Sequence, residues 1–284
     1  MRYYIDTNIL YNLKKVPQGV IKNAYTSSFA LMEIISGINE KDYNRRKACL
    51  KEIFTLNLDI DNRMPSGAIY GGFSIFREFK MTDSRVNLLK EAIRKCVVSS
   101  SFKEIESAAL DVSGVKIELF SKLDREISDN FVDLRQGVNN IMQEGGPQFI
   151  EINRQQHRLD TSAILRELFS VNSGEERMRL RLIDNLVSVV IININTSKAL
   201  DKPRFERDEI SKSYNGLLDN FITGQIRYFS SKLGVIELPG KNDSQDLYHL
   251  FYLRPGDKII SDDKFFKKYL PESSITLNEL IEQI

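Results

Sequence analysis

Both ends of the chain carry the same pattern, in which a short apolar run ends in polar residues and a helical segment follows. The first residues, MRYYID, predict a strand over residues 2–6, and KIISDD near the other end has the same character. Parallel strands need crossover helices, and helical segments separate these runs. The pattern predicts an α/β protein whose parallel-sheet core comes from residues 1–80 and 225–284. A mainly helical insertion, residues 81–224, interrupts it.

Further elements of this core follow from local signals. SSFALMEIISG predicts a helix over Ser27–Gly37, with Ser27 or Ser28 as the N-cap and Gly37 as the stop. A polar helix is expected over Lys41–Phe54, and the alternation in TLNLDI predicts a strand after it. Pro65 opens another helix. Towards the C-terminus, GVIELPG predicts a short strand and turn, DSQDLYHLFYL a helix, and SITL a last strand.

The clearest helical signal lies inside the insertion, over residues 115–142. Apolar residues recur there at intervals of three or four, which is the stripe of a long packed helix, and they are Ile117, Phe120, Leu123, Ile127, Phe131, Leu134, Val138 and Ile141. Gly145-Gly146-Pro147 ends the stripe. Such a stripe is more often core than interface, although the insertion could also carry the surface for a protein partner or inhibitor, or for a homo-oligomer.

Composition excludes several classes of protein. Lys and Arg together number 40 against 39 Asp and Glu, so the chain is no histone-like polycation. The longest apolar run, residues 186–194, is far shorter than the ~20 residues of a membrane helix. No secretory signal is visible, and two cysteines form neither a metal motif nor a disulfide framework. We expect a cytoplasmic protein without a membrane partner.

Carboxylates recur at the positions where an α/β sheet keeps its ligands. Asp6 ends the first strand, Glu33 lies in the second helix, Asp246 lies in the first turn of the late helix, and Asp262 and Asp263 end the strand after it. Acids gathered at one edge repel one another unless a cation lies between them. Mg²⁺ or Mn²⁺ is the usual cation at such a site.

Each acid also has a simpler interpretation. Capping accounts for Thr7 or Asn8 but leaves Asp6 unexplained. Asp246 could match the helix dipole or pair with Asp243 in a capping box, Asp262 and Asp263 could cap the next helix, and Glu33 could be solvated. One shared site explains all four positions, whereas the simpler interpretations need four independent coincidences in this order.

The order IDTNIL, MEIISG, DLYHL and IISDDKFF resembles the PIN-domain ribonucleases, which include the toxins of bacterial toxin–antitoxin pairs. The resemblance covers about half of the chain, residues 1–80 and 225–284. It implies a PIN-like core in which Asp6, Glu33, Asp246 and Asp263 are catalytic metal ligands and Asp262 is a fifth ligand. Asn8 and Ser261 would orient these carboxylates. The family toxins are much shorter, and the helical insertion has no counterpart in them.

The chemistry implied is that of an endoribonuclease that uses Mg²⁺ or Mn²⁺. A metal-activated water would attack the phosphodiester and leave a 5′-phosphate and a 3′-hydroxyl. Two alternatives stay open, which are a DNA nuclease of the same chemistry and a non-catalytic PIN-like scaffold whose insertion binds a protein or RNA. The two histidines, His157 and His249, are expected to be structural or exposed.

Basic residues are the candidates for contact with the nucleic-acid backbone. Arg45 and Arg46 follow the Glu33 helix, and Arg177 and Arg181 lie in the insertion. For the arginines of the insertion, the alternative is a solvated helix face on which nearby acids are their partners, namely Glu175, Glu176 and Asp184.

Overall fold

The computed structural model describes residues 1–77, 84–108, 117–129, 173–196, 205–233, 240 and 242–283. Its centre is a five-stranded sheet in the order β3-β2-β1-β4-β5, and every pairing is parallel. The strands are β1 (Tyr3–Ile5), β2 (Ala24–Ser27), β3 (Asp59–Asp61), β4 (Lys258–Ile260) and β5 (Ser274–Ile275). Helices flank this sheet, so the predicted α/β class with a parallel sheet is confirmed.

Strand β2 was not predicted from the sequence. Its residues, AYTS, are all buried, so the run shows no alternation of apolar and polar side chains. The hydroxyl groups are satisfied inside the protein, since Thr26 Oγ1 donates to the carbonyl of Ile5 at 3.0 Å and Ser27 Oγ lies 2.8 Å from Tyr4 Oη. Such a strand has no local signal, because its polar groups find partners only in the folded sheet.

Each strand passes almost directly into a helix at its carboxyl end. These helices are α1 (Thr7–Leu10), α3 (Ser28–Ser36), α5 (Pro65–Gly71), α14 (Lys264–Tyr269) and α15 (Leu277–Glu282). The residue at the junction caps the helix in four cases, and these caps are Asp6, Ser27, Asp263 and Thr276. Because the strands are parallel, these junctions share one edge of the sheet, called the carboxyl edge below.

The helix after β1 differs from the prediction. It begins at Thr7, and the carboxylate of Asp6 accepts a hydrogen bond from the Thr7 amide. The cap is therefore Asp6, and not Thr7 or Asn8 as the sequence indicated. Capping and a place among the acids are compatible, because each carboxylate oxygen accepts more than one hydrogen bond.

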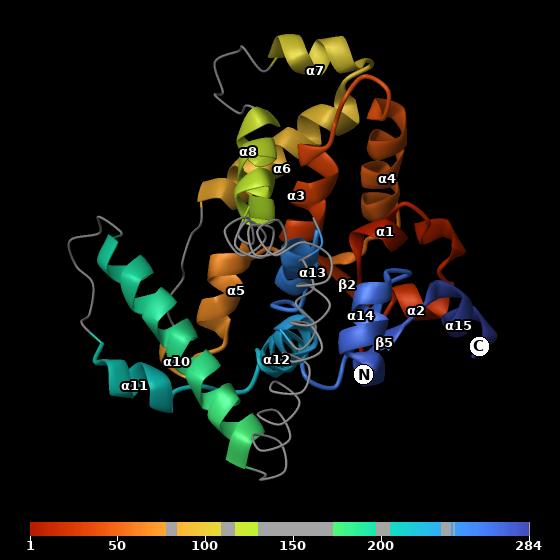
Figure 1. Cartoon of the computed structure of the whole chain (residues 1–284). Coiled ribbons are helices and arrows are strands. Elements are labelled where there is room, and N and C mark those ends of the chain that lie inside the picture. Colours follow the sequence, from red (N-terminus) through yellow and green to blue (C-terminus); the bar gives the residue numbers. More distant parts are fainter. Residues whose placement is uncertain are drawn as a thin grey trace, which may run out of the picture.

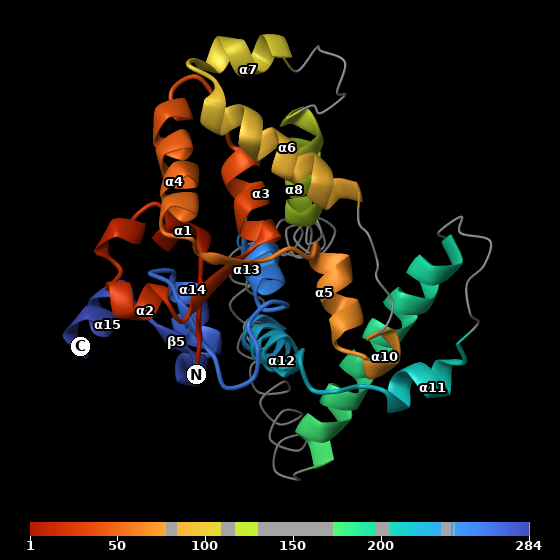
Figure 2. The same cartoon turned by 180° about the vertical axis from the view of Figure 1, so that it is seen from behind.

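The remaining helices pack around the sheet and beyond it (Figures 1 and 2). Helices α3, α4, α6 and α8 stand together at one end of the molecule with α7 above them, and α10 and α11 lie beside α5 and α12 on another side. Their bounds are α2 (Gln18–Ile21), α4 (Tyr43–Thr55), α6 (Ser84–Val98), α7 (Phe102–Ala108), α8 (Ile117–Ser128), α10 (Ser173–Thr196), α11 (Arg207–Lys212), α12 (Asp219–Leu233) and α13 (Asp243–His249). Single 3₁₀ turns span Leu13–Lys15, Ser74–Phe76 and Pro271–Ser273.

Several predicted boundaries were wrong. Helix α4 continues to Thr55 and Asn57 adopts a left-handed conformation with φ of 51°, so β3 starts only at Asp59. Helix α13 ends at His249, because the chain then turns instead of continuing to Leu253. The part of the insertion stripe beyond residue 129 lies outside the described residues, and so does GVIELPG apart from its last glycine.

The described residues between β3 and β4 form no strand, apart from one isolated antiparallel bridge between Phe73 and Tyr214. Their buried side chains join those of the sheet in one hydrophobic cluster, to which Phe120 and Val187 contribute. The predicted division into core and insertion stays a prediction. Among the described helices, none is both long and apolar enough to cross a membrane.

Candidate active site

Asp6 is held at the junction of β1 and β4. Its side chain is buried, and one carboxylate oxygen accepts from the Thr7 amide at 2.7 Å. The other oxygen accepts from Asn8 Nδ2 at 2.7 Å and from Ser261 Oγ at 2.6 Å. Asn8 Nδ2 also lies 3.0 Å from Ser261 Oγ. The two residues predicted to orient the acids therefore both contact Asp6, and they tie the ends of two neighbouring strands together.

Glu33 reaches the same edge from the second turn of α3. Its Oε2 accepts from the hydroxyl of Thr7 and lies 2.9 Å from His249 Nε2. The same nitrogen lies 3.4 Å from Asp6 Oδ1, so His249 is placed between the two acids. On the other side of the ring, Nδ1 lies 2.7 Å from Tyr4 Oη.

These contacts decide the charge of His249. Burial by itself lowers the pKa of the imidazole, but attraction to Glu33 and then to Asp6 outweighs burial and raises the pKa of His249 to about 9. At neutral pH both ring nitrogens therefore carry protons, and they donate to Glu33 and to Tyr4. The residue was expected to be structural or exposed. It is buried, and its protonated ring lies between the carboxylates of Asp6 and Glu33.

Asp246 and Asp263 complete the group of acids. Asp246 lies in the first turn of α13, and burial raises its pKa well above the ordinary value, helped by the negative charges of Asp263 and Asp6. In the described part of the chain, no group donates a hydrogen bond to its carboxylate. Burial likewise raises the pKa of Asp6, and Glu33 adds to that rise, while His249 and Ser261 oppose it. Asp6, Glu33, Asp246 and Asp263 thus share one electrostatic field.

Asp262 is not brought into this group, although it was predicted as a ligand. It is exposed, and its Oδ1 accepts from the Leu277 amide at 3.1 Å, at the start of α15. Its neighbour Asp263 caps α14 through the Phe265 amide at 2.7 Å. Of these two exposed aspartates, Asp263 is the one whose negative charge adds to the burial that raises the pKa of Asp246.

A further acid comes from the predicted insertion. Asp124 of α8 accepts from Ser36 Oγ at 3.0 Å and from Gln245 Nε2 at 2.9 Å, so it links α3 to α13. Burial raises the pKa of Asp124, and the negative charge of Glu33 adds to that rise. Sequence analysis missed Asp124, because only the packing of α8 against α3 and α13 places it beside Glu33.

The predicted basic residues have different surroundings. Arg46 donates to the carbonyls of Glu33 at 3.1 Å and Ile34 at 2.8 Å, so it satisfies the last turn of α3. Arg45 is exposed and lies over the Tyr11 ring, 4.4 Å from its centroid. Arg181 is exposed on α10. The side chain of Arg177 lies outside the described part of the structure.

The site residues fit a metal ion in their donor chemistry but not in their present arrangement. Several carboxylates beside one another are the donor set that Mg²⁺ and Mn²⁺ prefer, and at Asp246 the negative charges of Asp263 and Asp6 add to the burial that raises its pKa. The donor chemistry therefore fits. In the conformation described here, however, His249 bridges two of the acids, and no three His, Cys, Asp or Glu side chains among the described residues are grouped to hold an ion.

Comparison of the chain with protein-family models, with curated proteins and with solved structures yields no match. Its function is therefore inferred from the residues of the site.

Proposed function

We propose that the chain is a divalent-metal-dependent endoribonuclease built on a PIN-like core. The observation that supports this most is the shared field of Asp6, Glu33, Asp246 and Asp263 at the carboxyl edge of the parallel sheet, which is the edge where such sheets bind ligands. His249 contributes one positive charge against four carboxylates. A divalent cation would relieve the repulsion that remains.

The four acids would hold Mg²⁺ or Mn²⁺, with one of them exchanging its contact to His249 for the ion. When bound, such an ion supplies an activated water and stabilises the leaving oxygen of the phosphodiester. Asn8 and Ser261 keep the carboxylate of Asp6 in one orientation through two short hydrogen bonds. Tyr4 holds the far side of the His249 ring. The exposed Arg45 and Arg181 would contact backbone phosphates of the RNA.

The second candidate is a non-catalytic scaffold, and the position of His249 favours it. A protonated imidazole between Asp6 and Glu33 already neutralises part of the acidic charge from within the protein. The acids would then stabilise the fold through this buried ion pair, and the exposed helical surface would bind a protein or RNA.

One experiment separates the two candidates. Purified protein is incubated with labelled single-stranded RNA and DNA, with Mn²⁺, with Mg²⁺ and with EDTA. We expect cleavage of the RNA that depends on metal, and a loss of more than about 100-fold in Asp6→Asn and in Asp246→Asn, because each removes a ligand charge.

Asp262→Asn is the matched control. It removes the same charge at the same edge of the sheet, after β4, and its carboxylate accepts from the start of α15. We expect this variant to keep its activity at a temperature well below its unfolding midpoint. Absence of cleavage of any substrate under Mn²⁺, or full activity in Asp6→Asn, would favour the scaffold.

A further inference from the structure

Helix α8 lies against both of the helices that carry Glu33 and Asp246. It comes from the predicted insertion, and it packs against α3, which carries Glu33, and against α13, which carries Asp246 (Figure 1). Phe120 of α8 is fully buried, and Leu123 and Ile127 pack against the hydrophobic core. Because α8 contacts both helices, a displacement of α8 would move the two acids relative to each other.

On the side of α3, two hydrogen bonds join α8 to the last residue of that helix. Ser36 Oγ donates to Asp124 Oδ2 at 3.0 Å, and Ser121 Oγ donates to the carbonyl of Ser36 at 2.7 Å. Ser36 lies three residues after Glu33, almost one helical turn away. The last carbonyls of a helix have no partner within it, and α8 supplies one here. The end of α3 that carries Glu33 is therefore held by α8.

On the side of α13, two further hydrogen bonds reach the residues directly before Asp246. Gln245 Nε2 donates to Asp124 Oδ1 at 2.9 Å, and Ser244 Oγ donates to the carbonyl of Ile127 at 2.8 Å. Both Ser244 and Gln245 are buried. The carboxylate of Asp124 thus accepts from α3 with one oxygen and from α13 with the other.

Asp246 depends on this frame more than Asp6 and Glu33 do. Asp6 accepts hydrogen bonds from three groups, and Glu33 is held by Thr7 and His249. In the part of the chain that the structure describes, no group donates to the carboxylate of Asp246. Its position is therefore set by where α13 lies, and α8 contributes to that.

We propose that Asp124 is a positioning residue of the acidic site, which fixes the separation of Glu33 from Asp246 by joining α3 to α13. The use of this separation, to hold one divalent ion between both acids, rests on the proposed function. Mg²⁺ tolerates little departure from its ligand distances of ~2.0–2.1 Å, so a small shift of either helix weakens its binding. Asp124 acts through the two helices and touches neither ion nor RNA. The predicted insertion thereby controls the site through one side chain.

The test compares Asp124→Ala with Asp124→Asn, each well below its unfolding midpoint. Asp124→Ala removes both hydrogen bonds, so its Mn²⁺ affinity in calorimetry and its kcat for single-stranded RNA should fall by about 10- to 100-fold, with KM for RNA unchanged. Asp124→Asn should stay within about 3-fold of the unaltered protein, because the serine hydroxyl and the glutamine carboxamide can each donate or accept and so keep both links.

A third measurement needs neither metal nor cleavage. The Nε2 atom of His249 lies 2.9 Å from Glu33 Oε2, so the NMR signal of its proton reports the position of that carboxylate. In metal-free protein with isotope-labelled histidine at pH 6, we expect this signal to move in Asp124→Ala and to stay in place in Asp124→Asn. A loss of overall stability alone would leave the signal of the folded protein unchanged.

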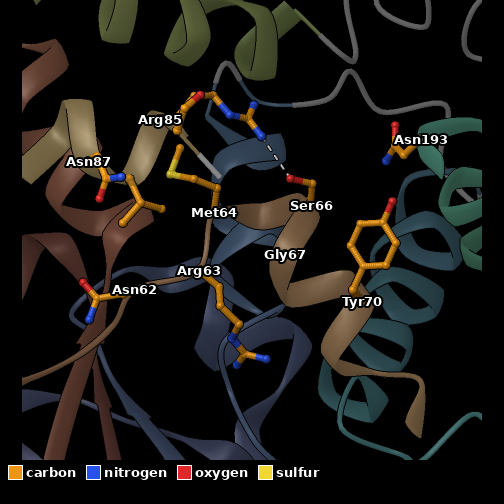
Figure 3. Close-up of a pocket in the computed structure, with 11 residues that line it drawn as sticks. Asn62, Arg63, Met64, Ser66, Gly67, Tyr70, Arg85, Asn87 and Asn193 are labelled. Carbon is orange, nitrogen blue, oxygen red and sulfur yellow. Dashed lines mark hydrogen bonds between the residues drawn. The ribbon is translucent and has the colours of Figure 1, made fainter. Parts of the chain in front are cut away.

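Two further serine variants complete the design. Ser244→Ala removes the other bond between α13 and α8, so it should lower Mn²⁺ affinity as Asp124→Ala does. Ser66→Ala is the matched control, because it removes the bond at 3.0 Å that Arg85 donates to Ser66 across a cavity that none of the four acids lines (Figure 3). It should leave all three measurements unchanged.

An unchanged His249 signal in Asp124→Ala overturns the proposal. An equal change in Asp124→Asn also overturns it, because the effect would then belong to the charge of Asp124 and not to its links. Unaltered Mn²⁺ affinity in Asp124→Ala has the same consequence where the unaltered protein binds Mn²⁺. If no variant and not even the unaltered protein binds Mn²⁺, the proposed function fails, and the His249 signal alone decides whether Asp124 positions Glu33.

Discussion

The stability of the protein should fall as pH rises through the titration of His249. In the folded protein the pKa of this imidazole is raised to about 9, whereas an unfolded histidine titrates near ~6.5. The folded state therefore binds a proton that the unfolded state releases between these values. A group with a raised folded-state pKa contributes its full stabilisation below the unfolded pKa and loses it as pH rises through the folded pKa.

The size of the effect follows from the same two values. Between pH ~6.5 and ~9, the free energy of unfolding should fall by about 1.4 kcal/mol per pH unit, or by about 3 kcal/mol in all. Burial also raises the pKa of Asp6 and Asp246, so their ionisation likewise lowers the free energy of unfolding as pH rises. His249→Gln removes the cation between Asp6 and Glu33, so at pH 6 it should destabilise the protein by a similar amount.

The assay is urea unfolding at constant ionic strength between pH 6 and 7.5, with linear extrapolation to zero denaturant. Burial raises the pKa of Cys49 to about 12 and that of Cys96 to about 11, whereas an unfolded thiol titrates near ~8.5, so this upper limit keeps both thiols protonated in the folded and in the unfolded state. His157→Gln removes the only other histidine, so comparison with this variant isolates the part of the slope that belongs to His249. A free energy of unfolding that does not change over this range would refute the reasoning, and so would a slope that survives in His249→Gln.

Three further outcomes are expected. Ser261→Ala should lower metal-dependent cleavage by about 10- to 100-fold and move the acid limb of the pH–rate profile upward, because the Ser261 hydroxyl holds the pKa of Asp6 down. Gly72→Ala should cost about 1–3 kcal/mol in urea unfolding, since its Cβ would lie 2.5 Å from Leu218 Cδ1. Gly19→Ala in α2, where a Cβ has no neighbour within 4 Å, should instead stabilise by about 0.5–1 kcal/mol in the same assay; a loss there would contradict the helix assignment.

Much of the sheet could be predicted from the sequence, because the relevant signals are local. An apolar run that ends in Asp6 followed by a helix, and another that ends in Ser261 before Asp263, are patterns of five or six neighbouring residues. Once the strands are taken as parallel, their carboxyl ends must meet at one edge. The contact of Asp6 with Ser261 needs in addition that β1 and β4 are neighbours, which only the strand order of the folded sheet decides.

Strand β2 and the direction of the side chain of Asp262 could not be obtained in this way. Residues Ala24–Ser27 look polar and irregular until the carbonyl of Ile5 accepts from Thr26. The choice between Asp262 and Asp263 depends on where α14 and α15 begin, since each helix takes one of the two carboxylates as a hydrogen-bond acceptor.

The charge of the site was decided only by tertiary structure. His249 stands 216 residues after Glu33 in the chain, yet its ring nitrogen lies 2.9 Å from that carboxylate, and Asp124 reaches the same region from a helix of the predicted insertion. Strand ends and helix caps are set by neighbouring residues, so the sequence predicts them. Ion pairs and pKa values depend on burial and on distances between segments, and these exist only after α3, α8 and α13 have packed together.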